Sequence, residues 1–113
     1  MKTMRLEDMI GGWFVGDFEK SILRTKDVEV AVKKYKAGDF EKLHYHYIAP
    51  EITVIVGGTV RMNGVEHGDG TIIRLDPGEG SDFTAVTDVM TIVVKIPSVP
   101  GDKYFEAPPL VNG

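Results

Sequence analysis

Two histidines separated by one residue, followed by a glutamate, are the residues of this sequence best suited to chemistry. His44 and His46 are two positions apart, and Glu51 follows the second histidine after five positions. On a β-strand, residues i and i+2 point to the same face of the sheet. Both imidazoles could therefore meet one ion, and Glu51 could add a third ligand from beyond the next turn. Two histidines and one carboxylate suit a divalent transition metal such as iron, manganese or zinc.

The elements that would position these residues are short β-strands. Runs rich in Val, Ile, Thr and Tyr predict strands, and clusters of Gly, Asp and Asn between them predict turns. Asn63-Gly64 lies between two such runs and favours a two-residue type I′ hairpin turn. Many short strands at this spacing are typical of an all-β sandwich or barrel. The predicted strands are 28–35, 52–56, 59–62, 71–75 and 89–96.

The N-terminal part predicts less regular structure. Residues 4–10 indicate a short helical turn outside the core. Trp13, Phe14 and Phe18 bracket a first strand, where their rings could cover an open end of the barrel or contact a second subunit.

Length and composition predict a single domain. A chain of 113 residues, 42% of them hydrophobic, can bury a core without disulfides, and it contains no cysteine. We expect one domain over residues 1–113, with a barrel core at about 12–97. Residues 98–113 are rich in proline and lack strand periodicity, so we expect an irregular tail that drapes over the surface and frays at its end.

Charge and hydropathy exclude two classes of partner. The net charge is −4 and no basic run exceeds Lys33-Lys34, which argues against nucleic-acid binding. No stretch approaches 18 apolar residues, so no membrane span is predicted. Glu7 and Asp8 stand where a signal peptide would need an apolar core. The default expectation is a cytoplasmic protein.

The histidine segment resembles the first motif of the cupin family, G-x5-H-x-H-x4-E-x6-G. Its fixed positions are met by Gly38, His44, His46, Glu51 and Gly58. The resemblance extends more weakly over residues 28–97 and implies a cupin-type jelly-roll barrel, also called a double-stranded β-helix. It also implies a divalent metal inside the barrel, whether Fe, Mn, Zn, Ni or Cu, with His44, His46 and Glu51 as ligands. Such binding needs neutral imidazoles and an ionised glutamate, so the affinity should collapse in acid.

The second cupin motif, G-x5-P-x-G-x2-H-x3-N, is incomplete. Gly70 and Gly78 fit it, but Asp76 replaces the proline, Ser81 the histidine and Ala85 the asparagine. Ser81 therefore occupies the position of the family's fourth metal ligand. Asp82 could substitute only if a bulge near Gly80 shifted the register, because strand alternation otherwise turns Ser81 inward and Asp82 outward.

Three ligands leave one coordination position open, which has two possible meanings. Metal enzymes use an open position for water or substrate. A missing ligand could equally mark a degenerate site in a non-catalytic ligand-binding or structural barrel. The family includes dioxygenases, isomerases and lyases, so we expect a metal-dependent enzyme acting on a small organic molecule, without a defined reaction.

Other polar residues are weaker candidates. Tyr35, Tyr47 and Asp82 are the candidate catalytic residues, and Tyr45 should face away from the histidines on either side of it. His67, beside a turn, and two strand arginines, Arg61 and Arg74, are expected to be solvated. The resemblance also implies a homodimer, formed through the strand around residues 13–15.

Overall fold

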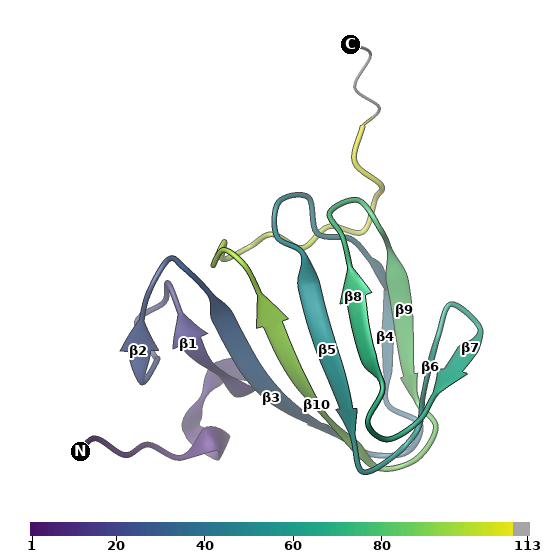
Figure 1. Cartoon of the computed structure of the whole chain (residues 1–113), viewed down its shortest axis with the longest axis horizontal. Helices are drawn as coiled ribbons and strands as arrows, with labels where there is room; N and C mark the ends of the chain where they lie inside the picture. The colour runs from purple at the N-terminus through teal and green to yellow at the C-terminus, as the bar shows by residue number, and fades with distance from the viewer. Residues whose placement is uncertain (110–113) are drawn as a thin grey trace.

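The chain folds into two β-sheets that lie face to face. In the computed structural model, which describes residues 1–109, ten strands form a six-stranded sheet A and a four-stranded sheet B (Figure 1). Sheet A has the order β2-β1-β3-β10-β5-β8, and its strands are β1 (Trp13–Gly16), β2 (Leu23–Arg24), β3 (Glu29–Tyr35), β5 (Glu51–Val56), β8 (Ile72–Leu75) and β10 (Val89–Lys95). Sheet B has the order β4-β9-β6-β7, and its strands are β4 (Phe40–His44), β6 (Val60–Met62), β7 (Val65–His67) and β9 (Ser81–Ala85).

Short 3-10 helices precede the first strand. They are η1 (Leu6–Asp8) and η2 (Ile10–Gly12), which overlap the helical turn predicted at residues 4–10. No helix in the described part of the chain is both long and apolar enough to cross a membrane.

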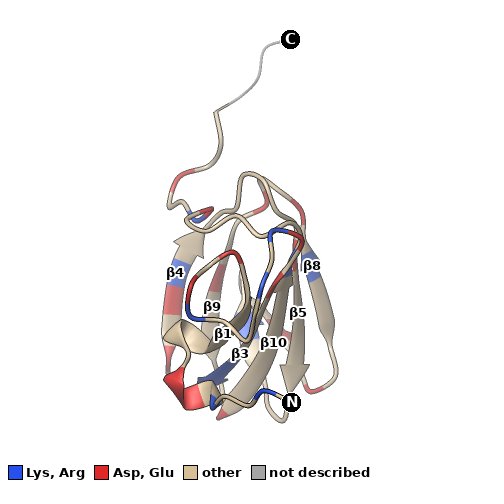
Figure 2. Cartoon of the chain, turned by 90° about the vertical axis from the view of Figure 1, so that its left-hand side faces the viewer, with Lys and Arg blue, Asp and Glu red and all other residues tan. Residues whose placement is uncertain are grey.

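The predicted all-β fold is confirmed. Each of the five predicted strand segments contains a strand, and the sheets are seen from the side in Figure 2, with β4 and β9 opposite β5 and β8. The β6–β7 hairpin turns through Asn63 and Gly64, whose φ angles of 50° and 79° are both positive, as a type I′ turn requires.

The apolar core occupies only one end of the space between the sheets. It consists of Ile55, Val60, Phe83, Ala85 and Val89. Full burial of side chains such as Ile55 and Phe83 contributes about 1.5–3 kcal/mol each. Toward the other end, the inward positions of β10 and β5 are Thr91, Val93 and Thr53, and polar side chains become frequent. This change of polarity leaves room for a site.

The C-terminal segment is irregular, as predicted, and part of it packs against the rest of the chain. Tyr104 pairs with Tyr45 through two main-chain hydrogen bonds of 2.7 and 2.9 Å. Ser98 and Asp102 are buried. The segment is therefore packed at least as far as Tyr104, because specific main-chain and carboxylate contacts hold it without any strand periodicity. Residues 110–113, on which the expected frayed end falls, lie outside the described residues.

Candidate metal centre

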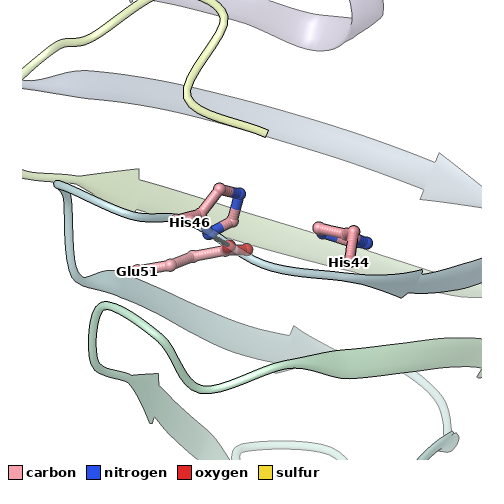
Figure 3. Close-up of side chains that lie close together, drawn as sticks. All are labelled: His44, His46 and Glu51. Carbon is pink, nitrogen blue, oxygen red and sulfur yellow. Dashed lines mark ion pairs between the residues drawn. The ribbon is translucent and has the colours of Figure 1, made fainter. Parts of the chain in front are cut away.

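His44, His46 and Glu51 converge between the two sheets. His44 ends β4 of sheet B, His46 follows in the connecting loop, and Glu51 begins β5 of sheet A. One potential ligand atom of each lies within 4.8 Å of the others (Figure 3). His46 is buried, whereas His44 and Glu51 are partly exposed. The spacing seen in the sequence thus produces a three-residue group able to hold a metal ion.

A contact with the main chain determines which ring nitrogen of His44 is available to bind a metal. Its Nδ1 lies 3.1 Å from the carbonyl oxygen of Lys42. A carbonyl oxygen can only accept, so Nδ1 carries the proton in this contact and Nε2 keeps its lone pair. Metal-binding histidines are commonly oriented by such a hydrogen bond from the other ring nitrogen.

Glu51 provides an independent test of whether the group fits a cation. Its Oε2 is buried and accepts no well-aligned hydrogen bond from the described residues, although His46 Nδ1 lies 2.9 Å away. Its Oε1 accepts a hydrogen bond from Thr53 Oγ1 at 3.3 Å. A buried carboxylate oxygen without a donor is costly. A bound cation would interact with this oxygen and offset the cost of burying it. The three residues therefore suit a metal ion.

The electrostatics favour the protonation states that metal binding requires. Burial lowers the pKa of His44, and the ammonium group of Lys103 contributes in the same direction. Burial would raise the pKa of Glu51, but contact with His46 and the charge of Lys95 outweigh it, and the pKa of Glu51 is lowered. His44 therefore favours its neutral form and Glu51 its ionised form.

A small cavity of about 130 Å³ adjoins the three residues, and polar and apolar side chains share its wall about equally. This volume corresponds to roughly four water molecules in the liquid. Besides the three candidate ligands, its polar lining includes Lys33, Tyr35, Glu41, Thr91, Lys95 and Lys103.

Tyr35 is the one of the two tyrosine candidates that lines this cavity. Its hydroxyl donates a hydrogen bond of 3.1 Å to Glu41 Oε1. Burial raises the pKa of Tyr35 strongly, and the negative charge of Glu41 raises it further. The phenol therefore remains protonated, with its single O–H donated to Glu41.

The position of the missing fourth ligand, a histidine in the family, also borders the cavity. Ser81 pairs with His44 across β4 and β9 and is 3% exposed. Ser81, Phe83 and Ala85 are buried, whereas Asp82 and Thr84 are only partly so, which confirms the predicted alternation. The Ser81 hydroxyl donates to the carbonyl of Asp82 at 2.6 Å.

Asp82 is engaged in the neighbouring hairpin. Its Oδ1 accepts a hydrogen bond of 2.7 Å from the main-chain N–H of Asn63, although the residue borders the cavity. It does not belong to the three-residue group, so the structure does not bring this candidate to the ligands.

The remaining candidates lie apart from the cavity. Tyr47 stacks on Tyr104 with a ring separation of 3.8 Å, and its hydroxyl donates to the carbonyl of Glu106. Tyr45 packs against Gly80, so it faces away from the histidines as predicted. His67 ends β7, opposite Val60 in sheet B. Arg61 and Arg74 form exposed ion pairs with Glu66 and Asp76.

Asp102 is a residue that the sequence did not indicate. Its carboxylate accepts hydrogen bonds from the main-chain N–H groups of Tyr47, Ile48 and Ala49 at 2.8, 3.2 and 2.9 Å. These residues form the loop between His46 and Glu51. The contact joins positions more than 50 residues apart, and no local pattern marks it.

Solved structures share this architecture. No protein-family model matches the sequence, and the comparison with curated proteins finds no significant match. An uncharacterized conserved protein with a double-stranded β-helix domain from Klebsiella pneumoniae is 16% identical, with a TM-score of 0.69 over 95% of this chain and 93% of that chain. An RmlC-like cupin from Shewanella frigidimarina is also 16% identical, with a TM-score of 0.61 over 66% and 70% of the two chains.

An enzyme is among the similar structures. The DMSP lyase DddQ from Ruegeria pomeroyi is 18% identical, with a TM-score of 0.68 over 82% of this chain. The match spans 49% of the DddQ chain. Taken together, these similarities show that the protein has the double-stranded β-helix fold of the cupins, as the first motif implied.

Proposed function

We propose that this protein is a metal-dependent enzyme acting on a small organic molecule, with His44, His46 and Glu51 as the metal ligands. The observation that carries the proposal is the convergence of His44, His46 and Glu51 within 4.8 Å at the edge of a cavity, with a buried Glu51 oxygen that, among the described residues, only the His46 ring approaches, in poor alignment. A known lyase of the same fold supports an enzymatic role.

The metal and the chain's own residues would have different tasks. A bound divalent ion would supply Lewis acidity, polarising an oxygen atom of the substrate. His44, His46 and Glu51 would hold the ion, and the space beside Ser81 would leave one coordination position open. Tyr35 holds a proton at its hydroxyl oxygen, and Glu41 accepts the hydrogen bond that orients it. The reaction type could be that of an oxygenase, an isomerase or a lyase.

Metal analysis of the purified protein tests this proposal. The wild-type chain should retain about one divalent ion per protomer after dialysis, whereas a His44→Ala, His46→Ala variant should retain little, since only Glu51 would remain. Equal and substoichiometric metal in both proteins would contradict the metal site. Retained metal without turnover of any small organic molecule would favour the alternative, a non-catalytic ligand-binding barrel.

We also propose that the chain forms a homodimer through the outer face of sheet A. The outward positions of its central strands are almost all apolar: Val30, Val32, Met90, Ile92, Val94, Ile52, Val54, Val56 and Ile72. Figure 1 shows no segment of the described chain crossing the front of β3, β10, β5 and β8. A flat sheet face packs well against another sheet face, and a second copy supplies an identical one.

The size of this face supports a dimer of the chain with itself. With strands about 4.8 Å apart and rows about 6.8 Å apart, the nine apolar positions cover roughly 300 Å². That is somewhat under half of what one partner buries in a standard interface, and the polar rim would add the rest. Ile92→Lys, in the middle of the face, should give a monomer in sedimentation velocity, whereas Val86→Lys, in the loop before β10, should not. A wild-type monomer at high concentration would refute this interface.

A further inference from the structure

Strand register directs lysines into the cavity beside the candidate metal centre. On β3 and β10, Lys33 pairs with Thr91, and Lys95 pairs with both Glu29 and Glu51. Directly paired residues share a face of the sheet. Lys33 and Lys95 therefore lie on the same inner face as Glu51, and both line the cavity.

Trp13 lies between these two ammonium groups. The Nζ atoms of Lys33 and Lys95 are 5.3 and 5.1 Å from the centroid of its ring. Lys103, from the C-terminal segment, lines the same cavity. None of these three lysines forms a salt bridge with a carboxylate of the described residues within 4.0 Å. Lys33 and Lys95 are partly buried, whereas Lys103 is exposed. A partly desolvated ammonium group without a close anion is costly, so the position of Lys33 and Lys95 requires an explanation.

The three lysines also influence one another. Burial lowers the pKa of Lys33, the carboxylate of Glu41 opposes this shift, and the charges of Lys103 and Lys95 add to it. An anion placed among the three groups would relieve both their repulsion and their desolvation.

The carboxylates near the cavity do not replace an anion among the lysines. Glu41 accepts a hydrogen bond from Tyr35, and Asp82 accepts one from Asn63. Glu29 balances part of the charge of Lys95, its partner in the sheet. A divalent ion with three lysines would supply five positive charges against four carboxylates, counting Glu51 itself, so an anionic ligand would still be attracted.

We propose that the cavity binds a small organic carboxylate, with one carboxylate held by Lys33 and Lys95 and a further oxygen directed to the metal. The second contact and the excess positive charge counted above both rest on the metal site proposed above, whereas the placement of Lys33 and Lys95 on the cavity wall does not. The cavity of about 130 Å³ accommodates only a few non-hydrogen atoms, so we expect a short-chain acid rather than a sugar phosphate or a nucleotide.

Titration calorimetry with malonate and with malonamide tests the proposal. Malonamide has a similar shape but carries no charge. Wild-type protein should bind malonate at least about tenfold more tightly than malonamide, because charge-assisted contacts require the ionised group. A Lys33→Met, Lys95→Met variant should lose this preference while keeping the length of both side chains. Lys34→Met, one position along β3 on the outer face, is the matched control and should behave as wild type.

Metal content and melting temperature, measured on each protein, keep the two proposals separate. If no metal is bound but malonate still binds in a lysine-dependent manner, the metal site fails and the anion site stands. If metal is bound but wild-type protein does not distinguish malonate from malonamide, the anion site is refuted. Unchanged malonate affinity in the folded double variant would refute it equally. If the double variant does not fold, the comparison of malonate with malonamide in wild-type protein decides whether the anion site exists.

Discussion

Replacing Asp102 should loosen the loop that carries the candidate metal ligands. Its carboxylate accepts three main-chain hydrogen bonds, and hydrogen bonds to a charged group contribute about 1.5–3 kcal/mol each. The sum overstates the effect, because Ile48 is exposed and Tyr47 partly exposed, so water can replace the carboxylate there. Only Ala49 is fully buried. We therefore expect Asp102→Ala to lower the free energy of unfolding by about 2–4 kcal/mol.

The same change should weaken metal binding. His46 and Glu51 flank the loop that Asp102 holds. In the variant, binding of the ion would have to order this loop again, and each 1.4 kcal/mol of ordering free energy lowers the metal affinity about tenfold. Urea denaturation and a competitive metal titration measure the two effects separately. Asp69→Ala is the control, since the Asp69 carboxylate also accepts a main-chain bond, from Gly57 at 2.7 Å, but Gly57 follows the end of β5 opposite Glu51.

The pH dependence of this effect follows from the same contacts. Burial would raise the pKa of Asp102, but the N–H groups of Ala49, Tyr47 and Ile48 outweigh it and lower the pKa below its usual 3.8. Because the pKa is lowered in the folded state, the Asp102 carboxylate contributes fully to the folding stability above pH 3.8. This contribution is lost as the pH falls through the folded-state pKa. The stability difference between wild type and Asp102→Asn should be constant near neutrality and shrink in acid.

Unchanged stability and unchanged metal affinity in Asp102→Ala would refute this reasoning. Lower stability with unchanged metal affinity would show that Asp102 holds the C-terminal segment in place without positioning the ligands.

Three further predictions concern the cavity and its edge. Gly80→Ala should destabilise the protein by about 1–3 kcal/mol in urea denaturation, because a Cβ there would overlap the Tyr45 ring; normal stability would contradict the packing of Tyr45. Ser81→His should tighten metal binding in a competitive titration by supplying a fourth ligand opposite His44, and no gain would mean that this position does not reach the metal. In an alkaline titration of tyrosinate absorbance, part of the signal should be delayed and should vanish in Tyr35→Phe, because burial and Glu41 raise the pKa of Tyr35.

Much of the fold was predictable because strand signals are local. β-branched residues marked the segments, and Asn63-Gly64 marked a hairpin turn that the structure confirms. Alternation also placed Ser81 inward, since that inference needs only the period of a strand. His44 and His46 also come together as predicted, with ring centroids 5.4 Å apart, although His46 lies in the loop after β4 and the strand rule alone does not place it.

The lysines and Asp102 were not predicted, for different physical reasons. Lys33 has the same parity as Tyr35, so alternation could have placed it in the cavity, but a lysine in a strand is usually solvated. In β3 the apolar positions Val30 and Val32 face outward, which reverses the usual rule for a half-buried strand. Asp102 depends on a long-range contact with main-chain groups, and main-chain groups carry no sequence signal.

The reversed polarity of β3 connects the cavity to the proposed dimer. If the outer face of sheet A met only water, Val30 and Val32 would be partly exposed to it while Glu29 was buried and Lys33 half-buried, and both would be unfavourable. A one-residue slip of β3 would exchange the two sets, so the observed register needs compensation on both faces. A second subunit would cover the valines of the outer face, and an anion with its metal would neutralise the charged groups of the inner face. Occupying the cavity should therefore stabilise the dimer as well as the fold, and malonate should raise the melting temperature less in Lys33→Met than in wild type.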